Sequence, residues 1–103
     1  MGFYQTTTFD GQRGSTAATY LAAVRGNPLL EVRTDAQVLA LLNDGTGVTG
    51  VQYRTQAGTG TALARHEVIL SAGALATPKI LQLSGIGPGP HLQSLGIPVW
   101  RDL

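Results

Sequence analysis

The apolar residues of the chain change their spacing along its length, and the first pattern is helical. Four of them follow one another at helical spacing: Ala17, Tyr20, Leu21 and Val24. Ser15 or Thr16 precedes them and can cap the free N–H groups of a first turn. Gly26-Asn27-Pro28 follows, with a glycine that can end a helix and a proline that cannot continue one. The pattern therefore predicts a helix over residues 17–24.

From residue 29 the spacing becomes that of strands. Residues 29–34, 38–42 and 48–55 are each rich in β-branched and aliphatic residues, and turns separate or follow them. The alanine and leucines of residues 38–42 would also allow a helix. Asn43-Asp44-Gly45 is a strong hairpin signal between the second and third segments. Residues 56–60 form another glycine-rich turn. We therefore expect residues 29–65 to form an antiparallel meander.

The stretch over residues 65–87 organises the rest of the chain. Val68-Ile69-Leu70 predicts a strand over residues 66–72 that is buried on both faces, as in a parallel sheet. Ser71-Ala72-Gly73 then makes a tight turn of small residues before a helix over residues 77–83, with Pro78 in its first turn. Small residues at such a turn permit the close approach of a ligand or tight packing of strand and helix, and the residues alone favour neither. A short helix over residues 90–95 is predicted next.

Composition limits the classes of function. The 103 residues are 43% hydrophobic and 13% charged, with a net charge of +1. This composition is unlike that of a disordered chain and fits a piece that is buried inside something larger. It has no basic run for nucleic acid, no cysteine, no apolar run of the ~18 residues that a membrane helix needs, and no signal-peptide pattern. We expect a cytoplasmic location and one partial domain over residues 1–103, without an internal boundary.

The polar residues form no catalytic constellation. Residues 45–50 read G-x-G-x-x-G, but they lie in a hairpin turn followed by a strand, whereas a dinucleotide fingerprint opens a helix. His66 and His91 have no carboxylate or cysteine at ligand spacing, so no metal site is expected.

Residues 73–87, GALATPKILQLSGIG, resemble the second signature of the glucose–methanol–choline (GMC) flavoprotein oxidoreductases. Every constrained position of that pattern is met. Residues 27–32, 48–53 and 96–99 are similar to further segments of the family, so the resemblance covers nearly the whole chain. It implies an α/β fold, a fragment of an FAD/NAD(P)-binding-type domain, with an antiparallel β-meander, a parallel-sheet strand and short helices.

The resemblance also implies a cofactor and residues that contact it. Val38 matches the position whose main chain contacts the adenine of FAD, and Ala72 and Gly73 match the strand end beside the ADP half. The implied reaction is alcohol oxidation with hydride transfer to the flavin, as in alcohol and choline dehydrogenases. The implied partners are a small-molecule alcohol and the remainder of a parent chain.

Two features of the family have no counterpart in these residues, namely the N-terminal βαβ fingerprint and the C-terminal catalytic histidine with its partner. We therefore expect the chain alone to be inactive, and poorly folded because the strand over residues 66–72 lacks its parallel neighbours. A non-catalytic truncated product, a small β-rich binding module and a flavin-containing lyase on the same fold are the alternatives.

Overall fold

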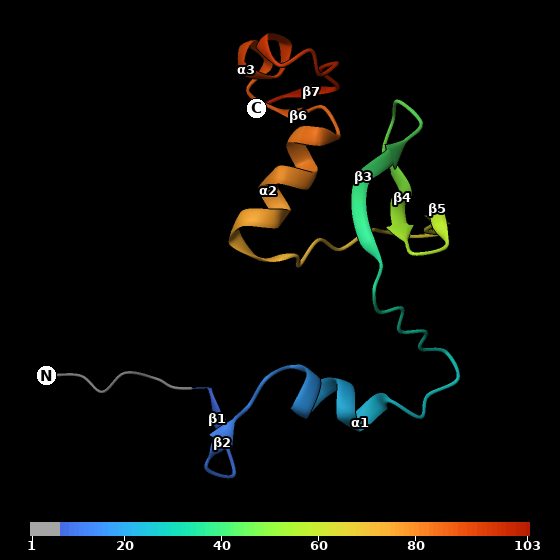
Figure 1. Ribbon diagram of the computed structural model, residues 1–103, viewed down its shortest axis with the longest axis vertical. Coiled ribbons are helices and arrows are strands. Elements are labelled where there is room, and N and C mark those ends of the chain that lie inside the picture. Colours follow the sequence, from blue (N-terminus) through green and yellow to red (C-terminus); the bar gives the residue numbers. More distant parts are fainter. Residues whose placement is uncertain (1–6) are drawn as a thin grey trace, which may run out of the picture. The chain divides into compact units, whose positions relative to one another are not determined.

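The computed structural model of the chain describes residues 7–103, which fall into two compact units that divide between Arg33 and Thr34 (Figure 1). Each unit has its own helices and strands. That residues 1–103 belong to one domain stays a prediction.

The first unit consists of a hairpin and a helix. Strands β1 (Thr8–Phe9) and β2 (Gln12–Arg13) pair in antiparallel fashion. The predicted helix over residues 17–24 is confirmed, but its first five residues, Ala17–Leu21, have π-helical hydrogen bonds and only Ala22–Val24 (α1) is α-helical. Ser15 Oγ accepts a hydrogen bond from the Ala18 N–H at 3.2 Å, which is the predicted capping contact.

The strand predicted over residues 29–34 is absent from the structure. This segment has no ladder partner among the described residues, and a strand exists only where a neighbour takes its backbone hydrogen bonds. Within this segment Arg33 Nε donates a hydrogen bond to Glu31 Oε1 at 2.6 Å, so these two side chains, two positions apart, lie on the same side of the backbone.

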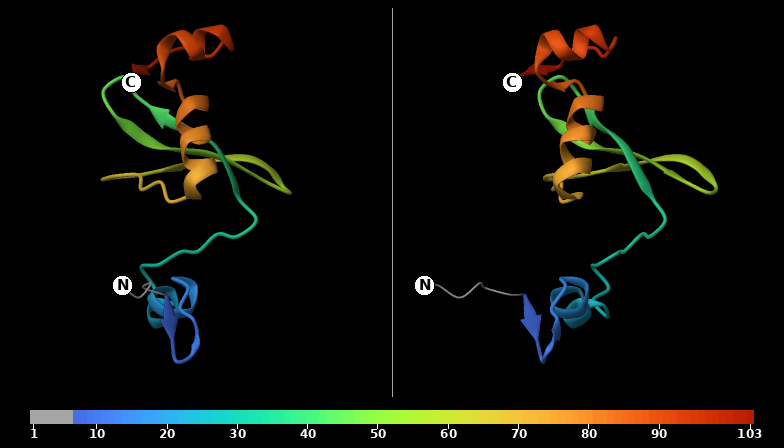
Figure 2. Two further views of the ribbon diagram at one scale, coloured as in Figure 1. Left: turned by 90° about the vertical axis from the view of Figure 1, so that its left-hand side faces the viewer. Right: turned by 60° about the vertical axis from the view of Figure 1, so that its left-hand side comes forward.

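The second unit is built on a three-stranded antiparallel sheet in the order β3-β4-β5 (Figures 1 and 2). Its strands are β3 (Gln37–Asn43), β4 (Val48–Thr55) and β5 (Gly58–Leu63). The predicted meander is therefore confirmed from β3 onward, and β3 is an edge strand. An irregularity in the register between Val38 and Ala40 leaves Leu39 without a partner on β4.

The loop between β3 and β4 is the predicted hairpin turn. Asp44 accepts hydrogen bonds from the backbone N–H groups of Thr46 and Gly47, each at 2.9 Å, and from the Thr46 hydroxyl at 2.7 Å. These hydrogen bonds stabilise the ionised carboxylate and lower the pKa of Asp44 to about 2. The bond from the Thr46 hydroxyl contributes most. The G-x-G-x-x-G of residues 45–50 is therefore hairpin and strand, as its sequence context indicated.

The structure corrects the prediction for residues 66–83. Residues 66–72 do not form a strand, and Ile69 is 76% exposed, because residues 7–103 contain no parallel neighbour that bonds this segment. Helix α2 (Gly73–Leu83) begins four residues earlier than predicted. Pro78 consequently lies inside the helix instead of in its first turn.

The end of the chain folds back on α2. Strand β6 (Ile86–Gly87) pairs in parallel with β7 (Arg101–Asp102), and α3 (Gly89–Ser94) connects them. Asp102 Oδ1 accepts a hydrogen bond from the Gly89 N–H at 2.6 Å at the start of α3. The predicted α/β class is confirmed, but the parallel pairing lies here and not in residues 66–72.

The isolated chain is expected to lack a cooperative thermal transition, because it buries few apolar side chains. Among the described residues only Leu41, Ile80 and Leu92 are buried hydrophobics, whereas Leu75 is 89% and Leu63 77% exposed. Such a core offsets little of the conformational entropy lost on folding. Calorimetry of the purified 103-residue chain checks this expectation, and a sharp melt of a soluble monomer contradicts it.

Candidate functional site

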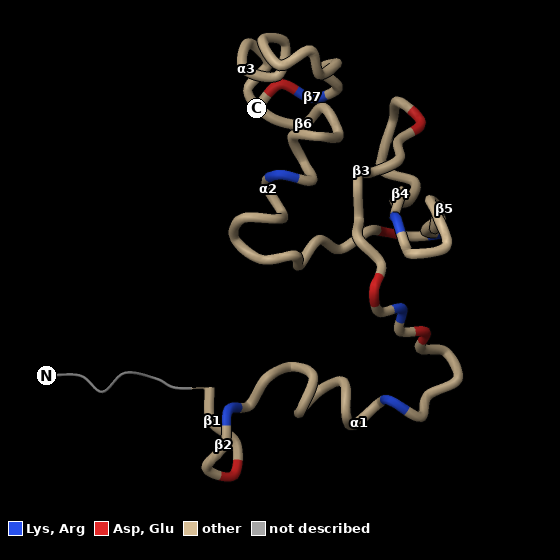
Figure 3. Tube along the Cα trace, in the orientation of Figure 1, with Lys and Arg blue, Asp and Glu red and all other residues tan. Residues whose placement is uncertain are grey.

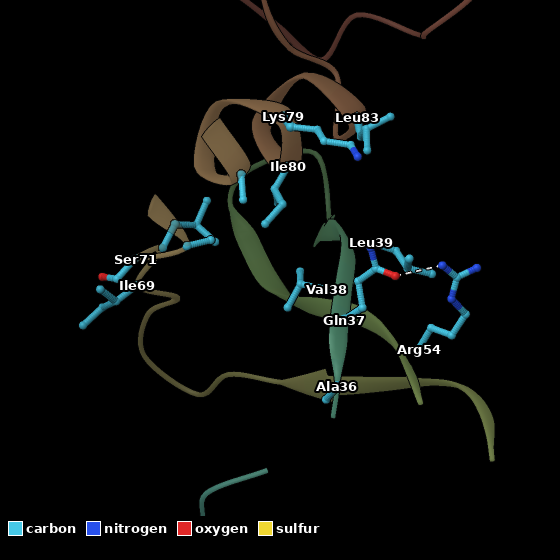
Figure 4. Close-up of a pocket in the computed structure, with 13 residues that line it drawn as sticks. Ala36, Gln37, Val38, Leu39, Arg54, Ile69, Ser71, Lys79, Ile80 and Leu83 are labelled. Atoms are coloured by element: carbon cyan, nitrogen blue, oxygen red, sulfur yellow. Dashed lines mark hydrogen bonds between the residues drawn. The ribbon is translucent and has the colours of Figure 1, made fainter. Parts of the chain in front are cut away.

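A cavity of about 630 Å³ lies between the edge strand β3 and helix α2. Residues 36–39 form one wall, and residues on one side of α2 form the other (Figure 4). Residues 69–72, the turn that leads into α2, contribute the third part of the lining. All of these belong to the unit Thr34–Leu103.

The structure brings two of the three predicted site residues to this cavity. Val38 on β3 and Ala72 before α2 both line it, although 34 positions separate them in the sequence. Gly73 is not part of the lining. It is the first residue of α2 and has a φ of +89°, a conformation that favours glycine. The roles of all three as cofactor contacts stay predictions.

The cavity has mostly apolar walls and two cationic side chains. Val38, Leu39 and Ile80 are among its apolar residues, while Arg54 of β4 and Lys79 of α2 supply positive charge. No Asp or Glu lines it. Arg54 Nη2 donates to Gln37 Oε1 at 2.8 Å, which holds the guanidinium beside the start of β3 (Figure 4).

These cations were not singled out from the sequence. Lys79 is the single charged residue of α2, as the charge distribution along the chain shows (Figure 3). A lone lysine in an otherwise uncharged helix was the signal available. Arg54 gave no such signal, because the pairing of β4 with β3 is what brings it to the cavity.

Two hydroxyl groups fix the ends of α2. Thr77 Oγ1 accepts a hydrogen bond from the Ala72 N–H at 3.1 Å, which closes the turn before the helix. At the other end, Ser84 Oγ donates to the Ile80 carbonyl at 2.6 Å and accepts from the Leu41 N–H at 2.8 Å. The second bond joins α2 to β3 over 43 positions of sequence.

This arrangement suits the binding of a ligand that has both a ring and an anionic group. Apolar walls accommodate a flat ring, and the two cations attract an anionic group beside it. His66 and His91 are exposed and do not line the cavity. Residues 7–103 hold no cluster of three or more His, Cys, Asp or Glu for a metal ion, and none of their helices is long and apolar enough to cross a membrane.

Comparison with known proteins identifies the family. A family profile described as GMC oxidoreductase matches residues 1–102. The chain belongs to the GMC oxidoreductase family. Its curated relatives include oxygen-dependent choline dehydrogenases from Burkholderia ambifaria, 43% identical over 99 residues, and Burkholderia thailandensis, 44% identical over 99 residues. Each of these matches covers 96% of this chain and 18% of the relative, so this GMC chain spans about a fifth of their length.

Solved structures of similar proteins have the same fold over most of this GMC chain. An FAD-dependent oxidoreductase from Chaetomium thermophilum superposes with a TM-score of 0.82 and 39% identity, covering 88% of this chain and 16% of that one. Pyridoxine 4-oxidase from Mesorbium loti also gives a TM-score of 0.82, with 33% identity, 92% of this chain and 19% of that one.

Proposed function

We propose that this chain forms part of the FAD site of an oxidoreductase that acts on the CH–OH group of a small alcohol. The observation that carries the proposal is the cavity between β3 and α2, which Val38 and Ala72 line together in a member of the GMC family. FAD, when bound, supplies the acceptor for the hydride that the alcohol loses.

The lining of the cavity fits the ADP half of FAD. An adenine ring is flat and largely apolar on its faces, and Val38 and Ile80 offer apolar surface on opposite walls. The edge of β3 offers backbone groups that β4 does not use, which suits hydrogen bonding to the ring edge. Arg54 and Lys79 would attract the negatively charged phosphates, and no carboxylate lines the cavity to oppose them.

A hybrid enzyme tests the proposal. Residues 1–103 would replace the homologous segment of the Burkholderia ambifaria choline dehydrogenase, which is 43% identical over 99 residues. We expect the purified hybrid to contain FAD and to oxidise choline or another small alcohol. Flavin content per chain and reduction of the flavin by the alcohol are the measurements.

The outcomes separate the alternatives. A folded hybrid without flavin contradicts the proposal and favours a non-catalytic chain or a binding module. A hybrid that contains FAD and cleaves a cyanohydrin without flavin reduction favours the lyase. A hybrid whose flavin is reduced by an alcohol supports the oxidoreductase.

Gly73→Val is expected to lower the flavin content of the hybrid severalfold. The valine has to adopt the positive φ of +89° beside Ala72, so the turn next to the cavity rearranges. A Cβ at this position meets no atom of the chain within 4 Å, so a clash within the chain does not explain the loss.

Gly96→Val is the matched control for that prediction. Gly96 also has a positive φ, +69°, and open space around a Cβ, but it lies after α3 and outside the cavity. Equal loss of flavin from both variants, or none from Gly73→Val, contradicts a role of Gly73 at the cofactor.

A further inference from the structure

Helix α2 and strand β3 are tied together at one end of the cavity. The tie is the Ser84 hydroxyl, which accepts from the Leu41 N–H at 2.8 Å. Leu41 lies two positions beyond Leu39, the last β3 residue that lines the cavity, and Ser84 directly follows Leu83, the last α2 residue of the lining. All lining residues on β3 precede Leu41 in the sequence, and all those on α2 precede Ser84. The bond therefore lies at one end of the cavity.

The hydroxyl is held in place on both sides. The Ser84 hydroxyl donates a hydrogen bond to the Ile80 carbonyl at 2.6 Å, one turn back in α2. Its lone pairs are therefore directed away from the helix. The Leu41 amide belongs to an edge strand, and the Leu41 side chain is only 7% exposed. Removal of the hydroxyl would leave this partly buried N–H without an acceptor, which a protein relieves by moving the strand or admitting water.

The spacing of the two cavity walls therefore depends on this bond. The Ile80 carbonyl accepts the hydrogen bond from the Ser84 hydroxyl. Ile80 is only 7% exposed, and it also lines the cavity. Val38 stands on the opposite wall, three positions before Leu41 on the same strand. A change in the separation of Leu41 and Ser84 moves these two walls relative to each other.

We propose that Ser84 is a positioning residue for the ADP half of the cofactor, setting the distance between β3 and α2 without touching the ligand. This inference rests on the proposed function of the cavity. It explains why a serine hydroxyl, and not merely a small side chain, stands at the C-terminal end of α2. Alanine at this position keeps the volume but loses the bond to β3.

The experiment compares four versions of the hybrid choline dehydrogenase that carries residues 1–103. They are the parent hybrid, Ser84→Ala, Ser84→Thr and Ser94→Ala. Ser84→Thr keeps the hydroxyl. Ser94→Ala is the matched control, because the Ser94 hydroxyl also donates to a carbonyl of its own helix, that of His91 at 2.7 Å, but forms no hydrogen bond with β3 among the described residues and lies outside the cavity. Each apoprotein is titrated with FAD and, separately, with ADP.

Ser84→Ala is expected to raise the Kd for both FAD and ADP about tenfold, equivalent to about 1.4 kcal/mol. Ser84→Thr should restore most of the affinity, and Ser94→Ala should leave both the affinity and kcat unchanged. A merely structural role would lower the melting temperature but leave the Kd for ADP unchanged, and that result overturns the inference.

Two further outcomes are decisive. If Ser84→Ala does not fold, Ser84→Cys, which keeps the size and weakens the acceptor, takes its place and is expected to give an intermediate Kd for ADP. An unchanged Kd in that variant also overturns the inference while the proposed function stands. A parent hybrid that binds neither FAD nor ADP overturns the proposed function, and the role of Ser84 with it.

Discussion

Gly50→Ala is expected to destabilise the sheet by about 3 kcal/mol, because the added methyl group has no room. Gly50 lies in the central strand β4, opposite Leu42 on one side and Leu63 on the other. A Cβ at Gly50 would lie 2.3 Å from the Ala62 carbonyl oxygen, and the ladder holds both the Gly50 backbone and that carbonyl in place. The strands β4 and β5 have to separate to admit it.

The melting temperature of the hybrid enzyme measures this effect, and a fall of roughly 2 to 3 °C is expected, since the shift per kcal/mol decreases as the chain becomes longer. Gly47→Ala is the matched control in the same hairpin. Gly47 has no positive φ and no atom within 4 Å of a Cβ, so its substitution should change stability by less than about 0.5 kcal/mol. Equal melting temperatures for the two variants would show that β4 and β5 are not packed as closely as the structure has them.

Gly85→Ala is expected to open the C-terminal part of the chain at a cost of about 3 kcal/mol or more, since it combines backbone strain with a clash. Gly85 has a φ of +79°, and a Cβ would lie 2.4 Å from the Pro98 carbonyl oxygen. The Gly85 carbonyl also accepts hydrogen bonds from the Trp100 N–H at 2.8 Å and the Arg101 N–H at 3.0 Å. The segment that carries β7 is therefore displaced.

Hydrogen exchange of the Trp100 and Arg101 amides in the hybrid enzyme reports this opening directly. Gly96→Ala is the control, because Gly96 shares the positive φ, +69°, but has open space around it. It should cost about 1 kcal/mol from the backbone alone. Unchanged protection of the two amides in Gly85→Ala would mean that the 85–101 contact does not hold β7 in place.

Local signals in the sequence were sufficient wherever an element satisfies its own hydrogen bonds. The helix over residues 17–24, the short helix after residue 88 and the hairpin at Asn43–Gly47 depend on neighbours a few positions away, and all are present. Strands β3 and β4 formed as predicted because a turn places them side by side.

The predictions that failed concern segments whose partners are distant. Residues 29–34 and 66–72 have the composition of strands, but no neighbouring strand is present among the described residues to bond them. Apolar composition reports a tendency to be buried, whereas a strand also needs a partner for its backbone. The early start of α2 at Gly73 was missed for another reason, because Pro78 was taken to mark the first turn.

The sequence by itself determined the family, the meander and the two residues, Val38 and Ala72, that prove to line one cavity. Only the tertiary structure decided that Arg54 and Lys79 supply its charge, and that the Ser84 hydroxyl ties α2 to β3. The physical reason is sequence distance. The Ser84–Leu41 bond spans 43 positions, and no local pattern encodes which backbone N–H a hydroxyl will meet once strand and helix have packed.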